Sequence, residues 1–143
     1  MRVYIPATVT ELALQTSGKW EPVHGYAATE ELAAAAPDLD EEELAELAID
    51  YAAEASAESL GSALRVVIAA DFSRADVSRD PDRGLAAVTI TGKLQPSAVA
   101  CVLMDEDDAA ADIAAARAGD HEAKERLEER SLLWFDLGEL TDR

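Results

Sequence analysis

The stretch LRVVIAA, residues 64–70, is apolar at almost every position, and it decides how the rest of the chain must be arranged. A β-strand turns alternate side chains to opposite faces, so an unbroken apolar run predicts a strand that is buried on both faces. The run AVACVLM at residues 98–104 is of the same kind. The sequence therefore predicts a central sheet that other elements cover on both sides.

Further strand patterns flank these two runs. They lie at residues 3–5, 22–27, 85–91 and 131–136, with Val77 in a candidate edge strand between residues 71 and 84. The segment 85–91 alternates Val88 and Ile90 with threonines, as a half-buried strand does. These patterns predict a sheet of about five or six strands.

Helical patterns occupy the intervals between the strands. The clearest begins at Asp40, where Asp40-x-x-Glu43 matches a capping box and apolar residues then recur at spacings of three and four. Other helices are predicted from Thr8 to Gly18, from Thr29 to Pro37, over residues 109–118, and from Asp120 to Arg130. The order β-α-β-α-α-β-β-β-α-α-β predicts one α+β domain over residues 1–143, with helices packed on a mixed, mostly antiparallel sheet.

The charge is strongly negative, with 30 acidic and 12 basic residues and a net charge of −18. Such a field repels nucleic-acid backbones and anionic membranes, so we expect neither as a partner. It favours solubility and a basic protein partner, although a merely solvated acidic surface is the simpler interpretation. No basic stretch precedes a long apolar one, and the apolar run at residues 94–104 is too short to span a bilayer. We therefore expect a cytoplasmic protein.

The apolar run at residues 98–104 leads directly into four acids, DEDD at 105–108. Strands that end in paired acids hold Mg²⁺ in phosphoryl-transfer proteins, and Asp105, Asp107 and Asp71 are the candidate ligands here. The cation that would stabilise a transferring phosphate is missing, because the nearby basic residues lie in helices beside acids. We favour a structural role, in which Asp105 or Asp107 caps the next helix and Asp108 lies in its first turn.

Other candidate sites are weaker. Trp20, His24 and Tyr26 could cluster and line a pocket, but ordinary packing explains them better. His24 and His121 are the only histidines, which excludes a multi-histidine metal site within one chain. Cys101 lies inside an apolar run, as a buried small side chain does. No nucleophile elbow, glycine-rich phosphate loop or CxxC pair is present, so we expect no catalytic residue, no metal and no cofactor.

Several segments of the chain resemble a known family. They are MRVYIPAT at residues 1–8, DEEELAELAIDYAAEAS at 40–56, RVVIAADFSRADV at 65–77, DRGLAAVTITGKLQPSAVACVLMDEDDA at 82–109 and LLWFDLGEL at 132–140. With these segments the chain resembles a family of small, acidic, uncharacterised proteins from high-GC Gram-positive bacteria, a domain of unknown function. The resemblance implies no activity, cofactor or site residue.

Three hypotheses for function follow from the residues. The first is a non-enzymatic protein–protein interaction or regulatory module, which would dock through the acidic helix from Asp40 to Ser59 and the helices after Asp105. The second is a Mg²⁺-dependent phosphoryl-transfer or hydrolase-type enzyme that uses the strand-end aspartates. The third is a nucleic-acid mimic, for which charge is the only motivation. We favour the first and leave the oligomeric state open.

Overall fold

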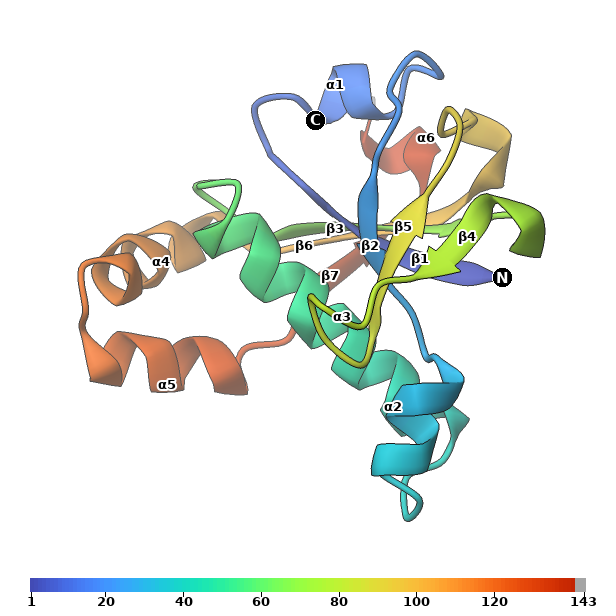
Figure 1. The fold of residues 1–143 in the computed structure, drawn as a ribbon. Helices are drawn as coiled ribbons and strands as arrows, with labels where there is room; N and C mark the ends of the chain where they lie inside the picture. The colour runs from blue at the N-terminus through green and yellow to red at the C-terminus, as the bar shows by residue number, and fades with distance from the viewer. Residues whose placement is uncertain (141–143) are drawn as a thin grey trace.

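The computed structural model describes residues 1–140, in which seven strands form one sheet in the order β4-β5-β2-β1-β3-β6-β7 (Figure 1). The strands are β1 (Arg2–Ala7), β2 (His24–Tyr26), β3 (Val66–Asp71), β4 (Val77–Arg79), β5 (Ala87–Ile90), β6 (Val99–Met104) and β7 (Leu133–Phe135). The α-helices are α1 (Leu12–Gln15), α2 (Glu30–Ala35), α3 (Glu41–Glu58), α4 (Ala110–Arg117), α5 (His121–Glu129) and α6 (Leu137–Leu140). Short 3₁₀ turns lie at Arg74–Asp76, Pro96–Ala98 and Asp107–Ala109.

The predicted α+β class and the order of elements are confirmed. The sheet has one strand more than the upper prediction of six, because Val77–Arg79 pairs with β5 at the sheet edge. Every neighbouring pair of strands is antiparallel, so the sheet is not mixed. The short helix α6 also follows β7, where the sequence pattern predicts no element.

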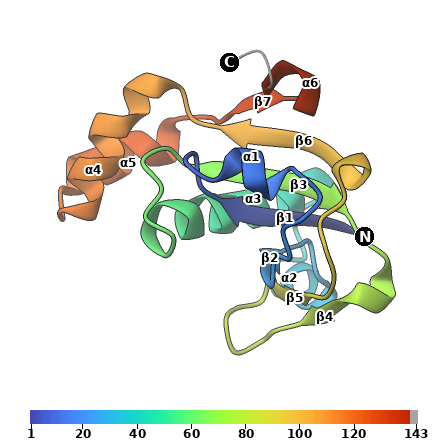
Figure 2. The same ribbon diagram turned by 90° about the horizontal axis from the view of Figure 1, so that it is seen from above.

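The two apolar runs form β3 and β6, which pair with each other near the middle of the sheet. One face of the sheet buries Ile5, Ile68 and Val102, against which Leu12 of α1 and Leu137 of α6 pack. The other face is covered by α3, and Figure 1 shows α1 and α6 above the strands β3 and β6 and α3 below them. Figure 2 looks down onto the sheet from the side of α1. Burial of both faces is therefore confirmed.

Helix α3 begins where the capping box predicts. The Glu43 backbone N–H donates to the Asp40 carboxylate at 2.9 Å, and the Asp40 N–H donates to the Glu43 carboxylate at 3.3 Å. Buried alanines such as Ala48 and Ala52 face the sheet, and their small side chains let the helix approach it closely. The buried Ser56 hydroxyl donates to the carbonyl of Ala7 at 2.6 Å and accepts from the Val66 N–H at 3.0 Å, which fixes the helix to β1 and β3.

The predicted helix start at Thr8 is wrong. Helix α1 begins at Leu12, and no side chain caps it. The Thr8 N–H donates to the Gln15 amide oxygen, and the Val9 N–H donates to the Ser62 hydroxyl, both at 3.1 Å. In a capping box, Glu11 would accept from the Thr8 N–H and the Thr8 hydroxyl would accept from the first turn. Gln15 takes the place of Glu11 here, and the Thr8 hydroxyl has no hydrogen-bond partner within residues 1–140.

Helices α4 and α5 form a hairpin beside the C-terminal half of α3 (Figure 1). Ile113 and Leu127 pack with Ala57 and Leu64 at the base of this hairpin. Asp120 caps α5 by accepting from the Glu122 N–H at 3.0 Å and the Ala123 N–H at 3.3 Å, as predicted. A separate question is whether any helix could span a bilayer. None of the helices in residues 1–140 has the length and apolar character that this requires.

Candidate functional site

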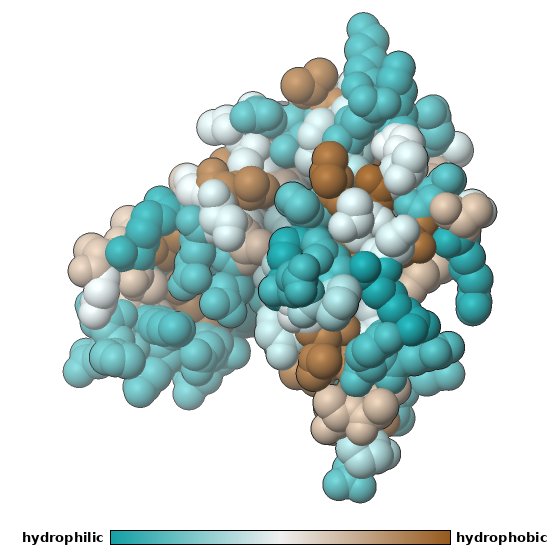
Figure 3. All heavy atoms as spheres, in the orientation of Figure 1, coloured by the Kyte–Doolittle hydropathy of each residue, from teal (hydrophilic) through white to brown (hydrophobic). Residues whose placement is uncertain are grey.

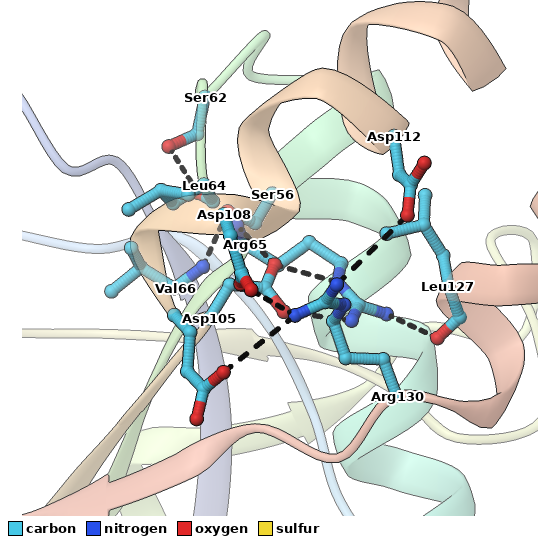
Figure 4. A network of polar contacts seen from close by, with 11 residues as sticks. Ser56, Ser62, Leu64, Arg65, Val66, Asp105, Asp108, Asp112, Leu127 and Arg130 are labelled. Carbon is cyan, nitrogen blue, oxygen red and sulfur yellow. Dashed lines mark hydrogen bonds and ion pairs between the residues drawn. The ribbon is translucent and has the colours of Figure 1, made fainter. Parts of the chain in front are cut away.

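Asp105 is buried at the end of β6, with only 1% of its surface exposed. Its carboxylate accepts from Arg65 through the backbone N–H at 2.9 Å, Nε at 2.8 Å and Nη2 at 2.8 Å (Figure 4). Arg65 Nη1 also donates to the carbonyl of Leu127 at 3.3 Å. The pair therefore connects β3, β6 and α5.

The predicted capping role for Asp105 or Asp107 is wrong. Helix α4 follows Ala109, and no side chain bonds to its N-terminal backbone. The guanidinium and backbone of Arg65 occupy the Asp105 carboxylate instead. Asp108 does lie in the first turn of the short 3₁₀ segment, where its carboxylate pairs with Arg130 Nη1 at 2.8 Å.

The structure does not bring the three candidate metal ligands together. Asp71 ends β3 and accepts from Arg2 Nε at 2.8 Å, and this hydrogen bond lowers the pKa of the Asp71 carboxyl. Because β3 and β6 are antiparallel, Asp71 and Asp105 lie at opposite ends of the sheet, about 20 Å apart by strand rise. Asp107 lies in the turn after β6. Within residues 1–140, no three His, Cys, Asp or Glu side chains are grouped to hold a metal ion.

Trp20, His24 and Tyr26 do not share a pocket in the fold. Trp20 packs against the buried cluster on the α1 side of the sheet. Tyr26 packs on the α3 side, where its ring stacks on that of Tyr51 with centroids 6.1 Å apart. His24 is exposed on β2. The opposite faces of the sheet therefore separate the two aromatic side chains.

A cleft of about 500 Å³ lies between α3 and the hairpin of α4 and α5. Its size is within the range of ligand sites in proteins. Apolar side chains in its lining are Ala57, Ile113, Ala116 and Leu127. Charged side chains come from both walls: Asp50, Glu54, Glu58, Arg65, Arg117, Asp120, Lys124, Glu128 and Arg130, with His121 beside them. Helical periodicity in the sequence indicated the acidic face of α3, but no sequence pattern indicated this cleft.

The arginines of the cleft are bonded to groups outside it or to backbone. Arg65 holds Asp105, as described above. Arg117 Nη2 donates to the carbonyls of Ala57 at 2.7 Å and Ser62 at 2.9 Å. Arg130 pairs with Asp108. These guanidiniums are therefore not the partners of the acidic side chains in the cleft.

The acids on the cleft walls have no close cationic partner. Among the residues that the structure describes, Asp50, Glu54, Glu58 and Glu128 form no ion pair within 4 Å. Burial raises the pKa of Asp50, against an opposing effect of Arg65. Burial and then the Glu58 carboxylate raise the pKa of Glu54, which Lys124 only partly offsets. The cleft therefore carries uncompensated negative charge.

These acids continue a longer row along α3. Glu42, Glu46, Asp50, Glu54 and Glu58 recur every four residues and are all exposed. No lysine or arginine lies between Glu41 and Glu58. Like charges four residues apart on a helix repel by about 0.2–0.5 kcal/mol for each pair. These five side chains, the acidic row, therefore lower the stability of the isolated protein.

Replacing Glu54 with glutamine is expected to stabilise the isolated protein at about pH 7, because it removes repulsion from Asp50 and Glu58. Two pairs at about 0.2–0.5 kcal/mol each give a gain of up to about 1 kcal/mol. The raised pKa of Glu54 means that the folded state binds its proton more tightly, so the gain should shrink as the pH falls through the carboxyl range to about 4. Urea denaturation at the two pH values measures this, and a loss of stability at neutral pH would contradict it.

The comparisons with known proteins add a family but no activity. Neither a curated protein nor a solved structure matches the chain. A family model matches residues 1–142, and its description reads "Family of unknown function (DUF6912)". The resemblance to an uncharacterised domain is thereby confirmed over nearly the whole sequence, and the chain belongs to this family of unknown function.

Proposed function

We propose that this protein is a non-enzymatic, cytoplasmic interaction module that binds a basic protein partner through α3. The observation that carries the proposal is the acidic row, five exposed carboxylates on a helix without one basic residue. A solvated surface does not require charges to be aligned at a spacing that makes them repel. Cations of a partner would remove this repulsion on binding. The repulsion that destabilises the isolated protein would therefore make binding more favourable.

The dimensions of the row suit a folded or extended basic segment. Glu58 lies sixteen positions after Glu42, which corresponds to about 24 Å along the helix at 1.5 Å per residue. Figure 3 shows hydrophilic side chains over much of the face that includes α3 and α5, with hydrophobic side chains in separate patches. Charged surfaces of this kind chiefly accelerate association and select partners by charge. We therefore expect binding that weakens with salt.

The proposal is tested with a basic peptide of about twenty residues that alternates arginine and alanine. Its affinity for the wild type and for a variant with Glu42→Gln and Glu46→Gln is measured by fluorescence anisotropy. We expect the variant to bind about three- to tenfold more weakly, and the difference to shrink between about 50 and 300 mM salt.

A matched control has the same change in net charge away from α3. Glu11 and Glu21 are exposed and form no ion pair within residues 1–140, so Glu11→Gln with Glu21→Gln serves this purpose. We expect this control to bind within about twofold of the wild type. Equal weakening in the two double variants would mean that only net charge acts, and the proposal would be wrong.

A nucleic-acid mimic is the second candidate, because alignment of carboxylates in one row is what such a protein needs. The row gives one charge per about 6 Å of helix, whereas a strand of B-DNA gives one per about 3.4 Å of axis. This lower density favours a protein partner that does not bind DNA. Competition with duplex DNA distinguishes the two candidates. The partner of a mimic binds DNA, so duplex DNA would displace it from α3. A partner that does not bind DNA would stay bound.

The magnesium-dependent alternative receives no comparable support. Its three aspartates lie at separate places, and Asp105 is already bonded through both carboxylate oxygens to Arg65. Calorimetric titration with Mg²⁺ is the direct test of that alternative.

A further inference from the structure

We propose that the cleft between α3 and the α4–α5 hairpin receives an arginine side chain of the basic partner. This inference rests on the proposed function and assigns its anchor point. The acidic row continues into the cleft, where Asp50, Glu54 and Glu58 form one wall and Glu128 belongs to the other. The row alone would attract any cation, so selection of a specific group depends on the shape and chemistry of the cleft.

The charges in the cleft select a cation over an anion. Arg65, Arg117 and Arg130 already donate to Asp105, to backbone carbonyls and to Asp108. Only Lys124 and His121 among the lining basic side chains make no hydrogen bond or ion pair within residues 1–140. By ion pairs alone, five lining acids are unpaired (Asp50, Glu54, Glu58, Asp120 and Glu128), against the two lining cations Arg117 and Lys124 within residues 1–140. An anion would meet repulsion, whereas a cation would find acceptors.

The apolar lining selects a cation on an aliphatic stem. Ala57, Ile113, Ala116 and Leu127 contribute to the cleft between the charged walls. A hydrated metal ion gains nothing from such surfaces, but the methylene groups of a long basic side chain bury against them. This combination matches lysine or arginine of a protein and excludes a bare inorganic cation as the preferred ligand.

Arginine fits the arrangement of acceptors better than lysine. Glu54 and Glu58 are one helical turn apart on the same wall, and Glu128 interacts with Glu54 from α5. A planar guanidinium offers five N–H donors in a fixed fork and can bond to two carboxylates at once. A lysine ammonium is a compact, strongly hydrated charge without this fixed geometry. The expected occupant is therefore the guanidinium of an arginine.

The experiment titrates the full-length protein with the peptide acetyl-Gly-Ser-Arg-Ser-Gly-amide and follows backbone amide shifts by NMR. Two further peptides replace arginine with lysine or with citrulline, which has the same shape but no charge. We expect the arginine peptide to shift the amides of Ala57, Gly119 and Leu127, the lysine peptide to bind at least threefold more weakly, and the citrulline peptide to leave these amides unchanged. Equal binding of arginine and citrulline peptides would overturn the proposal.

Two variants separate the cleft from the rest of the row. Glu54→Gln with Glu58→Gln should weaken binding of the arginine peptide at least tenfold, whereas Glu42→Gln with Glu46→Gln, outside the cleft, should change it less than twofold. Both variants keep helix-forming residues, and circular dichroism verifies that they are folded. If both weaken binding equally, the anchor in the cleft is wrong while the proposed function of α3 stands. If Glu42→Gln with Glu46→Gln and the control Glu11→Gln with Glu21→Gln weaken binding of the long basic peptide equally, the proposed function itself is wrong.

Discussion

Replacing Asp105 with alanine is expected to lower the free energy of unfolding by about 3–5 kcal/mol, because the change leaves a largely buried guanidinium without its partner. The Asp105 side chain is fully buried, and that of Arg65 is only 13% exposed. Removal of the carboxylate also leaves the Arg65 backbone N–H without an acceptor. Urea denaturation, with circular dichroism as the probe, measures the loss.

The pair of Arg2 and Asp71 provides a matched control. Its shortest contact is also 2.8 Å and joins neighbouring strands, but the two side chains are 45% and 57% exposed. Water therefore solvates the partner that remains, and Asp71→Ala should cost less than about 1 kcal/mol. Similar losses at Asp71 and Asp105 would show that burial does not control the strength of these pairs.

A second comparison separates the cost of an unpaired charge from the value of the pair. Changing Arg65 to methionine and Asp105 to leucine together removes both charges and retains apolar volume. We expect this double variant to be more stable than Asp105→Ala alone, because no buried charge is left without a partner. A double variant that is less stable than Asp105→Ala would contradict this explanation.

Local sequence patterns predicted much of the fold, because their signals lie within a few residues. The capping residues Thr29, Asp40 and Asp120 each bond to a backbone N–H that is two or three positions ahead. The apolar runs of β3 and β6 likewise required burial on both faces whatever the remainder of the chain did. These features depend on interactions within short segments, so contacts with distant parts of the chain did not change them.

Where the predictions failed, a distant residue competed with the local signal. Thr8 resembles a helix cap, yet Gln15 and Ser62 satisfy the backbone there. Asp105 resembles a cap before α4, yet its partner Arg65 lies forty residues earlier in the chain. The one available signal was the position of Arg65, a basic residue directly before a buried strand. Sequence spacing alone does not indicate which acid such a residue will meet.

The sequence predicted less of the candidate site than of the fold. The acidic face of α3 follows from helical periodicity, and this helix was a predicted docking surface. The cleft beside it depends on how the α4–α5 hairpin packs at Ile113 and Leu127, which is a tertiary property. Similarly, antiparallel pairing of β3 with β6 separated Asp71 from Asp105, although both follow apolar strands.

The second large effect concerns the centre of the sheet, where Ile68→Ala is expected to cost about 2–5 kcal/mol. Ile68 is fully buried and lies between Ile5 of β1 and Val102 of β6 in register. The substitution removes three carbon atoms from a site that strands confine on both sides, so neighbouring side chains cannot easily fill the space. Guanidinium or urea denaturation gives the change, and an unchanged m-value would show that the unfolded state is the same.

A graded series makes this prediction specific to packing. Ile68→Val removes one methyl group and should cost about 0.5–1.5 kcal/mol, between the wild type and alanine. Leu85→Ala is the surface control, because the Leu85 side chain is 51% exposed and its removal creates no enclosed cavity. We expect a change within about 0.5 kcal/mol at that position. If Ile68→Ala were as mild as the surface control, β3 could not be the buried centre of the sheet, and the arrangement that positions α3 and its acidic row would lose its basis.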